Sequence, residues 1–162
     1  MVPAAYVLLL RTGTTGDEVL LQLRQGTGFR DGYWAAAAAG HIERGEAAPA
    51  AACREAREEL GVTVDPDDLV PLVTLHRTEN TGDPVDERVD FFFTCRRWTG
   101  EPRRREPDKS ADLRWCALDA LPDPVVPHEH RVLDALRAGS TPAIATHGFA
   151  GSAAAARDNL TG

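Results

Sequence analysis

The sequence predicts a single α/β domain built around a mixed β-sheet. A chain of 162 residues is about the length of one domain and is long enough to form a hydrophobic core. Its apolar fraction of 43% and charged fraction of 27% are typical of a globular protein. Strand-like runs alternate with two segments that have helical features, which is the pattern of an α/β domain rather than of an all-helical or all-β one.

The N-terminal part predicts a β-hairpin. Residues 4–11 (AAYVLLLR) and 18–24 (EVLLQLR) are apolar and partly β-branched, and the turn-rich TGTTGD lies between them. The glycine-rich QGTGFRDGY that follows is expected to be a loop. Residues 34–40 (WAAAAAG) are ambiguous because alanine favours helices, and we interpret them as a short buried strand.

Residues 47–60 carry the clearest helical features. Pro49 is tolerated in a first turn, Glu46 suits the positive N-terminal end of a helix, and Gly61 is a natural C-terminal stop. We therefore predict one helix over this segment.

The second half predicts three more strands and a second helix. Residues 69–77, 88–97 and 112–118 are strand-like, and residues 127–138 have apolar positions at helical spacing before a glycine. From residue 140 to residue 162 the chain has few large apolar residues, so a loosely attached tail is expected there.

Charge and cysteine content exclude several classes of protein. The net charge of −7 argues against stable nucleic-acid binding through a basic face. Cys53, Cys95 and Cys116 are odd in number and form no CxxC pair, so neither a disulfide framework nor a zinc site is expected. The apolar start is too short for a membrane span and lacks the basic residues of a signal peptide, so the sequence predicts a cytoplasmic protein without a membrane segment.

The predicted central helix gathers negative charge on one face. Glu55, Glu58 and Glu59 fall within roughly a 100° sector of an α-helix, and like charges at this spacing repel one another. A divalent cation would reverse that cost, and carboxylate oxygens suit Mg²⁺ or Mn²⁺. The alternative is a solvated charged face on which Arg54 and Arg57 neutralise the glutamates.

The spacing of this segment favours the metal site. Residues 40–62 read GHIERGEAAPAAACREAREELGV, which resembles the Nudix box GX5EX7REUXEEXGU at every fixed position, with Ala56 as a small residue at U. The resemblance to the MutT-like branch of the Nudix hydrolases extends over roughly residues 4–138, within a domain expected at 1–139. Many members carry Pro-Gly-Gly where this chain has Ala38-Ala39-Gly40. The resemblance implies the Nudix fold, a mixed β-sheet sandwiched between helices (α/β/α).

The resemblance also implies roles for the residues of the box. Metal ions, Mg²⁺ or alternatively Mn²⁺, would be held by Glu55, Glu58, Glu59 and the backbone carbonyl of Gly40.

A second set of residues would support this metal site. Arg54 would pair with Glu46 and hold the loops of the box in register, a task suited to a bidentate guanidinium. Family members often add a carboxylate from a downstream loop, and Glu106 is the candidate here, ahead of Glu101. Which glutamate accepts the proton of the attacking water stays open among Glu55, Glu58 and Glu106.

Residues that bind the rest of the substrate are harder to identify from sequence. Arg24 lies at the end of the second strand, where such enzymes often reach a phosphate. Trp34 and Phe91–Phe93 offer aromatic surfaces for a base, although aromatic residues are more often core residues. Asp90 or Asn80 could read a base edge by hydrogen bonding.

The resemblance implies hydrolysis of a nucleoside diphosphate linked to another group. The segments EPDK and RW resemble MutT-like members that act on nucleoside triphosphates, including oxidised or modified ones, and release the monophosphate and pyrophosphate. Two alternatives stay open. One is hydrolysis of ADP-ribose, a nucleotide sugar or another dinucleotide, and the other is a nucleotide-sensing module without catalysis. The expected partner is a nucleotide substrate, and the sequence leaves open whether two copies form a homodimer.

Overall fold

The computed structural model describes residues 1–150, and within them eight strands form one mixed sheet. The strands are β1 (Val2–Thr12), β2 (Asp17–Arg24), β3 (Trp34–Ala36), β4 (Ala38–His41), β5 (Leu69–Arg77), β6 (Arg88–Cys95), β7 (Ser110–Ala117) and β8 (Ile144–His147). The helices are α1 (Ala48–Glu55), the π-helix η1 (Ala56–Leu60), the short 3-10 helices η2 (Pro66–Asp68) and η3 (Pro84–Asp86), and α2 (Pro127–Ala138). The predicted mixed α/β architecture is confirmed.

The long strand β1 is the centre of the sheet. Its first half lies between β4, which is antiparallel to it, and β6, which is parallel, whereas its last residues pair with β2. The path β3-β2-β1-β6-β5-β8 runs across the sheet, with β7 on the outer side of β2. Parallel and antiparallel pairs therefore meet on one strand, which makes the sheet mixed.

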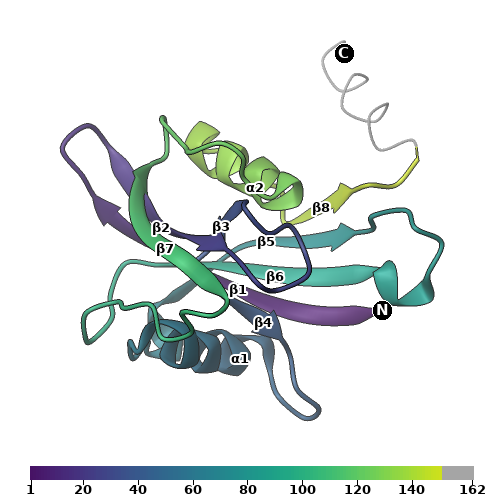
Figure 1. Ribbon diagram of the computed structural model, residues 1–162, viewed down its shortest axis with the longest axis horizontal. Coiled ribbons are helices and arrows are strands. Elements are labelled where there is room, and N and C mark those ends of the chain that lie inside the picture. Colours follow the sequence, from purple (N-terminus) through teal and green to yellow (C-terminus); the bar gives the residue numbers. More distant parts are fainter. Residues whose placement is uncertain (151–162) are drawn as a thin grey trace.

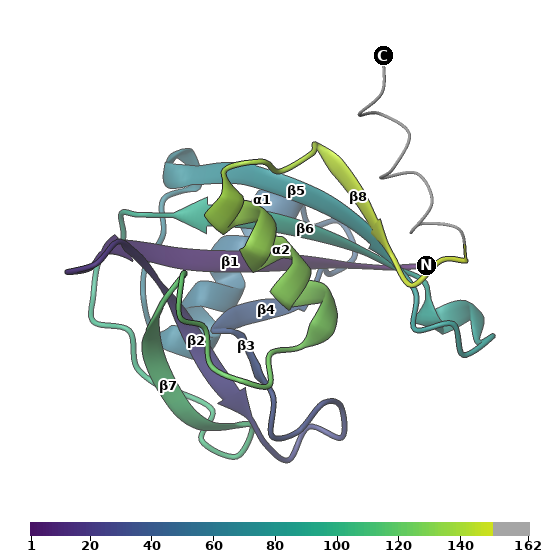
Figure 2. The ribbon, with the colours of Figure 1, turned by 90° about the horizontal axis from the view of Figure 1, so that it is seen from above.

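The two main helices cover opposite faces of this sheet, as Figures 1 and 2 show. Along β1, the side chains of Tyr6 and Leu8 belong to the core cluster that includes Leu133 of α2. The alternate residue Val7 belongs to the cluster that includes Ala52 of α1. Because successive strand residues point to opposite faces, an unbroken apolar run on β1 supplies both cores at once.

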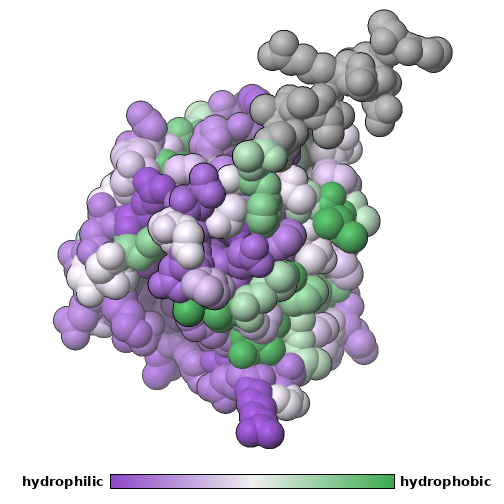
Figure 3. Space-filling model, turned by 90° about the vertical axis from the view of Figure 1, so that its right-hand side faces the viewer, coloured by the Kyte–Doolittle hydropathy of each residue, from purple (hydrophilic) through white to green (hydrophobic). Residues whose placement is uncertain are grey.

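The outer surface is mostly polar. The face that carries the N-terminus and the end of β8 is mainly hydrophilic, with separate apolar patches (Figure 3). Among residues 1–150, the large apolar residues that are exposed are few: Met1, Phe29, Val70, Val85 and Ile144. In the described part of the chain, no helix combines the length and apolarity needed to cross a membrane.

The predicted segments agree with the structure where their side chains have a clear periodicity. The strand at 69–77 and the helix at 127–138 have the predicted bounds. The run at 34–40 forms two short strands, β3 and β4, which pair with β2 and β1 respectively. The predicted single helix over 47–60 begins as α1 and becomes a π-helix from Ala56, before Gly61 ends it at a φ of 72°.

The predicted tail from residue 140 needs correction in its first part. Residues 144–147 form β8, parallel to β5, and the backbone N–H of Thr74 donates to the carbonyl of Ala143 at 2.9 Å. Backbone hydrogen bonds hold this strand, and its four residues are too few to show a clear alternation in the sequence. The remainder of the predicted tail, residues 151–162, lies outside the described residues.

Candidate active site

The candidate site begins where β4 passes the end of α1. Gly40 lies on β4, and the carboxylate of Glu55, the last residue of α1, lies against it. A Cβ built on Gly40 would overlap with the carboxylate carbon and both carboxylate oxygens of Glu55. Glu55 is only 8% exposed, and this burial raises the pKa of its carboxyl group. The glycine thus allows a buried carboxylate to approach the backbone.

Arg54 connects the elements around this contact. Its Nε and Nη2 donate to the two carboxylate oxygens of Glu46 at 2.8 and 2.9 Å, so the predicted bidentate pair is present. Nη1 donates to Glu55 at 2.6 Å and to Glu58 at 3.2 Å, and Nη2 also donates to the carbonyl of His41 at 3.0 Å. These hydrogen bonds lower the pKa of Glu46 to about 2. One guanidinium therefore ties the loop after β4 to the helix.

Glu59 lies on the π-helix and faces the backbone of β4. Its Oε2 accepts a hydrogen bond from the N–H of Ala39 at 2.8 Å, and its side chain contributes to the wall of a pocket. The pKa of Glu59 is raised to about 8, mainly by burial. The hydrogen bond from Ala39 lowers this pKa, whereas the negative charges of Glu55 and Glu106 raise it further. A buried carboxylate with other carboxylates near it is stabilised by a cation.

The other predicted carboxylates are more open. Glu58 is 53% exposed and contacts only Arg54. Glu106 lies in the loop before β7 and pairs with Lys109 at 3.2 Å. Glu101 is exposed and lies on the far side of that loop, beside Gly61.

The carboxylate oxygens of the predicted site are the kind of ligand that a hard divalent cation prefers. Within residues 1–150, no three Asp, Glu, His or Cys side chains are gathered around a common point at metal-binding distance, because the guanidinium of Arg54 lies between Glu55 and Glu58. Glu59, however, is a partly buried carboxylate, and desolvation raises its pKa. Oxygen ligands of this kind suit Mg²⁺ or Mn²⁺ rather than zinc.

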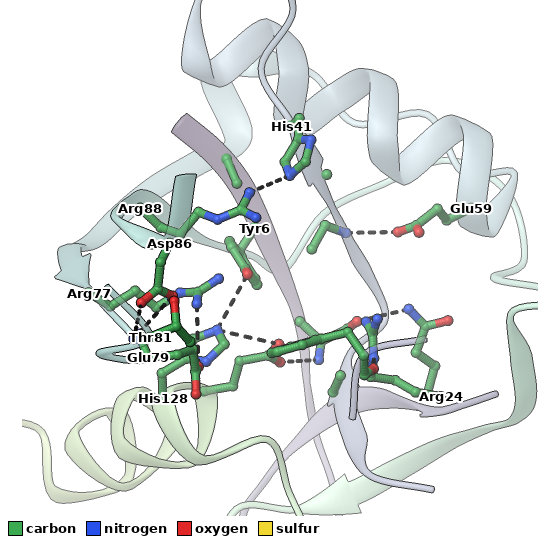
Figure 4. Close-up of a pocket in the computed structure, with 18 residues that line it drawn as sticks. Tyr6, Arg24, His41, Glu59, Arg77, Glu79, Thr81, Asp86, Arg88 and His128 are labelled. Carbon is green, nitrogen blue, oxygen red and sulfur yellow. Dashed lines mark hydrogen bonds and ion pairs between the residues drawn. The ribbon is translucent and has the colours of Figure 1, made fainter. Parts of the chain in front are cut away.

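A pocket of about 460 Å³ opens beside Glu59 and extends toward α2 (Figure 4). Ala39, Gly40, His41 and Glu59 line its end near the box. Its opposite end is lined by residues from β1, β3, β5 and α2: Tyr6, Ala36, Arg77, His128 and Glu129. Of the predicted metal-binding residues, Gly40 and Glu59 therefore line a cavity large enough for a small ligand, whereas Glu55, Glu58 and Glu106 do not.

The floor of the pocket holds buried charged groups. Arg77 donates to the fully buried Asp90 at 2.5 Å, and His128 Nε2 lies 3.8 Å from the same carboxylate. Glu129 accepts a hydrogen bond from the backbone N–H of Ala36 at 2.5 Å. Burial lowers the pKa of His128 to about 2 and raises that of Glu129 to about 7, so both side chains favour their neutral forms relative to water.

The three predicted substrate-binding residues have different positions. Arg24 lines the pocket. Asp90 lies beneath it, and its carboxylate is engaged by Arg77, so a role in reading a base would be indirect. Trp34 is 6% exposed and belongs to the core cluster under α2, which corrects the expectation that it offers a stacking surface.

The aromatic run Phe91–Phe93 and Asn80 also lie outside the pocket lining. Phe92 is a core residue, and Phe91 and Phe93 pack in the core on the α1 side. Asn80 is exposed in the loop after β5 and does not line the pocket. Aromatic residues on a central strand were used for packing, which is their more common role.

Sequence reasoning missed several pocket residues: Tyr6, Phe29, Arg77, Arg88, His128 and Glu129. They come from separate segments that only the fold brings together. One signal was present, since His128 and Glu129 are a polar pair on the buried face of the predicted helix at 127–138. A titratable pair on a buried helix face is a candidate for a binding site.

Comparisons with known proteins agree with the geometry of this site. A family model described as NUDIX domain matches residues 1–136. The structure of a MutT NUDIX hydrolase from Burkholderia pseudomallei is 26% identical, with a TM-score of 0.71 over 82% of this chain and 95% of that chain. The Nudix hydrolase RenU from M. smegmatis is also 26% identical, with a TM-score of 0.59 over 85% of this chain and 84% of that chain.

A curated relative has a different name. An isopentenyl-diphosphate Delta-isomerase of Rhodobacter capsulatus is 30% identical over 115 residues, which are 67% of this chain and 61% of the isomerase. The chain thus spans about three fifths of the length of this relative. Because the family model covers most of the chain and the structural relatives share its fold, this protein belongs to the NUDIX domain family.

Proposed function

We propose that the chain is a metal-dependent hydrolase that cleaves the diphosphate linkage of nucleoside triphosphates, including modified or oxidised ones, to the monophosphate and pyrophosphate. One observation carries this proposal. Gly40 and Glu59 of the box line a 460 Å³ pocket whose walls also carry Arg24, Arg77 and Arg88. A site with metal-binding carboxylates at one end and cations on its walls suits a phosphate-bearing substrate.

The box residues supply the metal site in this proposal. Glu55, Glu58, Glu59 and the carbonyl of Gly40 would hold Mg²⁺ or Mn²⁺, with Glu106 as a further ligand. The bound ion would screen the phosphate charge and lower the pKa of the attacking water. Arg54 positions this set, because its contacts with Glu46, Glu55 and Glu58 fix the helix against the loop after β4.

The remaining residues would bind and orient the substrate. Arg24 presents a guanidinium to the pocket, where it would contact phosphate oxygens. Phe29 is 39% exposed at the pocket and offers a ring face to a base. His128 and Glu129 at the floor present ring-nitrogen and carboxyl groups that would pair with the polar edge of that base. The proton of the attacking water would pass to a carboxylate oxygen of Glu55, Glu58 or Glu106.

The pocket disfavours an apolar substrate group. An isopentenyl group, which the name of the Rhodobacter capsulatus relative implies for that enzyme, has no polar atoms. Such a group placed against Arg77, Glu129 and His128 would displace water from polar side chains and offer them no hydrogen bond. Hydrolysis of ADP-ribose, a nucleotide sugar or another dinucleotide remains the alternative enzyme activity, and a nucleotide sensor remains the alternative without catalysis.

A panel of nucleotides tests the proposal. The purified protein is incubated with Mg²⁺ and nucleoside triphosphates, their oxidised forms, ADP-ribose and nucleotide sugars, and the products are separated by chromatography. We expect at least one nucleoside triphosphate to yield the monophosphate and pyrophosphate. We also expect its kcat/KM to be the highest among the compounds of the panel. Preferred cleavage of ADP-ribose or a sugar nucleotide would support the alternative enzyme, and binding without any product would support a sensor.

Two further expectations concern the whole protein. Cys53, Cys95 and Cys116 are free thiols in the structure, and we propose a cytoplasmic location, where thiols stay reduced. Association as a homodimer can be tested by light scattering of the full chain.

A further inference from the structure

Two arginines that line the pocket have only uncharged hydrogen-bond partners. Arg88, the first residue of β6, donates from Nη1 to Nε2 of His41 at 2.7 Å. Arg24 donates from Nε to the carbonyl of Phe29 at 2.8 Å and from Nη2 to the hydroxyl of Thr27 at 2.9 Å. Among residues 1–150, neither guanidinium has a carboxylate within the 4.0 Å of an ion pair. Each keeps N–H groups that can bind an anion.

The third arginine of the pocket is paired with carboxylates, which sets these two apart. Arg77 pairs with Asp90 at 2.5 Å and with Glu79 at 3.6 Å. Asp86 accepts hydrogen bonds from a hydroxyl and from backbone N–H groups of its own loop, at 2.9 to 3.0 Å. Burial raises the pKa of Asp90, and the positive charges of Arg77 and Arg88 oppose this rise, but of these two arginines only Arg77 forms an ion pair with Asp90.

The fold explains how Arg88 reaches the box. Residues of β6 and β4 flank β1 on its two sides, with Val2 paired to Arg88 and Ala4 paired to His41. Ala4 lines the pocket and is small, so the long side chain of Arg88 can reach across β1 to the ring of His41. Because arginine only donates, His41 Nε2 must be the acceptor, which holds the guanidinium next to the residue that follows Gly40.

Arg88 and Arg24 lie on opposite sides of the pocket in Figure 4, with Glu59 at the box end. We propose that Arg88 is a second anion-binding residue, which together with Arg24 selects ligands that carry a further phosphate beyond the diphosphate held at the box. This inference rests on the proposed function and deepens it. It implies that the pocket prefers ligands with a triphosphate chain over ligands in which a diphosphate is joined to a neutral group.

The test uses phosphate chains without a base, so that base specificity does not enter. Methylene-bridged analogues of inorganic di- and triphosphate resist hydrolysis, and their binding to the full chain in Mg²⁺ is measured by calorimetry. Wild-type protein should bind the triphosphate analogue more tightly than the diphosphate analogue. Arg88→Gln should reduce the affinity for the triphosphate analogue about 10-fold or more and the affinity for the diphosphate analogue less than about threefold. This difference is expected for loss of a charge-assisted contact with the additional phosphate.

Arg97→Gln is the matched control, since Arg97 follows the other end of β6, is 83% exposed and does not line the pocket. It removes the same charge and should leave both affinities unchanged. If Arg88 has a purely structural role, Arg88→Gln will have a lower melting temperature and will bind both analogues more weakly by the same factor. That result overturns the proposal. A wild-type protein that binds the triphosphate analogue no more tightly than the diphosphate analogue also overturns it. Triphosphate preference without hydrolysis of any nucleotide would instead contradict the proposed function alone.

Discussion

The carboxylate of Glu55 lies so close to Gly40 that a Cβ on the glycine would overlap with both carboxylate oxygens. The glycine of the box is therefore required by packing in this chain, at the point where β4 meets the end of α1. The same contact brings the backbone of Gly40 and a carboxylate together, which are two of the proposed ligands of one metal ion.

Replacement of Gly40 by Ala should destabilise the protein by about 1–3 kcal/mol, the usual cost of overpacking. Thermal unfolding measures this cost. The double variant Gly40→Ala/Glu55→Ala should recover most of the loss, because removal of the carboxylate makes room for the methyl group. If the two substitutions destabilise additively, the contact is not the cause.

Replacement of Arg54 by Ala should lower both the melting temperature and the rate. The change leaves Glu46 without its bidentate partner and places Glu55 and Glu58 next to each other without a cation. Arg54→Lys should recover only part of each loss, since lysine cannot form the bidentate pair. Arg57→Ala is the control, because Arg57 is exposed on the same helical segment. Wild-type stability and rate in Arg54→Ala would contradict the positioning role.

Glu59 and Glu106 should differ in their contribution to kcat. Glu59 is fixed by the N–H of Ala39 at 2.8 Å, whereas Glu106 lies in a loop and is 41% exposed. Glu59→Gln should therefore reduce kcat about 10³-fold or more, and Glu106→Gln about 10- to 10²-fold. Steady-state kinetics on one nucleotide at saturating Mg²⁺ checks both values. Near-normal activity of Glu59→Gln would exclude Glu59 as a metal ligand.

Glu129 should make stability depend on pH. Burial raises its pKa from 4.5 to about 7, so between these values the folded state binds more protons than the unfolded state. The contribution of Glu129 to stability is therefore greatest below about pH 4.5 and falls as the pH rises toward 7. Glu129→Gln keeps an acceptor for the N–H of Ala36 and lacks this titration.

Denaturant unfolding of both proteins between pH 4.5 and 8 measures the effect. The stability of Glu129→Gln relative to wild type should rise by about 3 kcal/mol over this range. A difference that stays constant with pH would show that Glu129 titrates normally.

Sequence periodicity was sufficient to predict the bounds of those elements in which buried and exposed side chains follow a regular pattern. The runs at 69–77 and 127–138 alternate or repeat clearly, and the bounds of β5 and α2 match. The alanines at 35–39 have no such periodicity, so the division into β3 and β4 could not be seen. The change from α- to π-helix at Ala56 occurs where Glu55 and Glu59 lie against β4, a tertiary contact that a helical wheel does not include.

The candidate site was predictable only where its residues are close in sequence. The Arg54–Glu46 pair and the Gly40–Glu55 contact lie within one segment of 23 residues, whose spacing is the recognised pattern. Arg88, His128 and Glu129 come to the pocket from β6 and α2. Their convergence depends on the order of strands in the sheet, and no local pattern encodes it.

The most direct test of the central claim is the metal requirement of hydrolysis. Turnover of the best nucleotide in the panel is measured with Mg²⁺, with excess EDTA, and after Mg²⁺ or Mn²⁺ is restored. The proposed metal site predicts loss of turnover in EDTA and recovery with either ion. It also predicts a rate that increases from neutral to mildly alkaline pH as water and carboxylates lose protons. Undiminished turnover in excess EDTA would contradict the assignment of Glu55, Glu58 and Glu59 to a metal site.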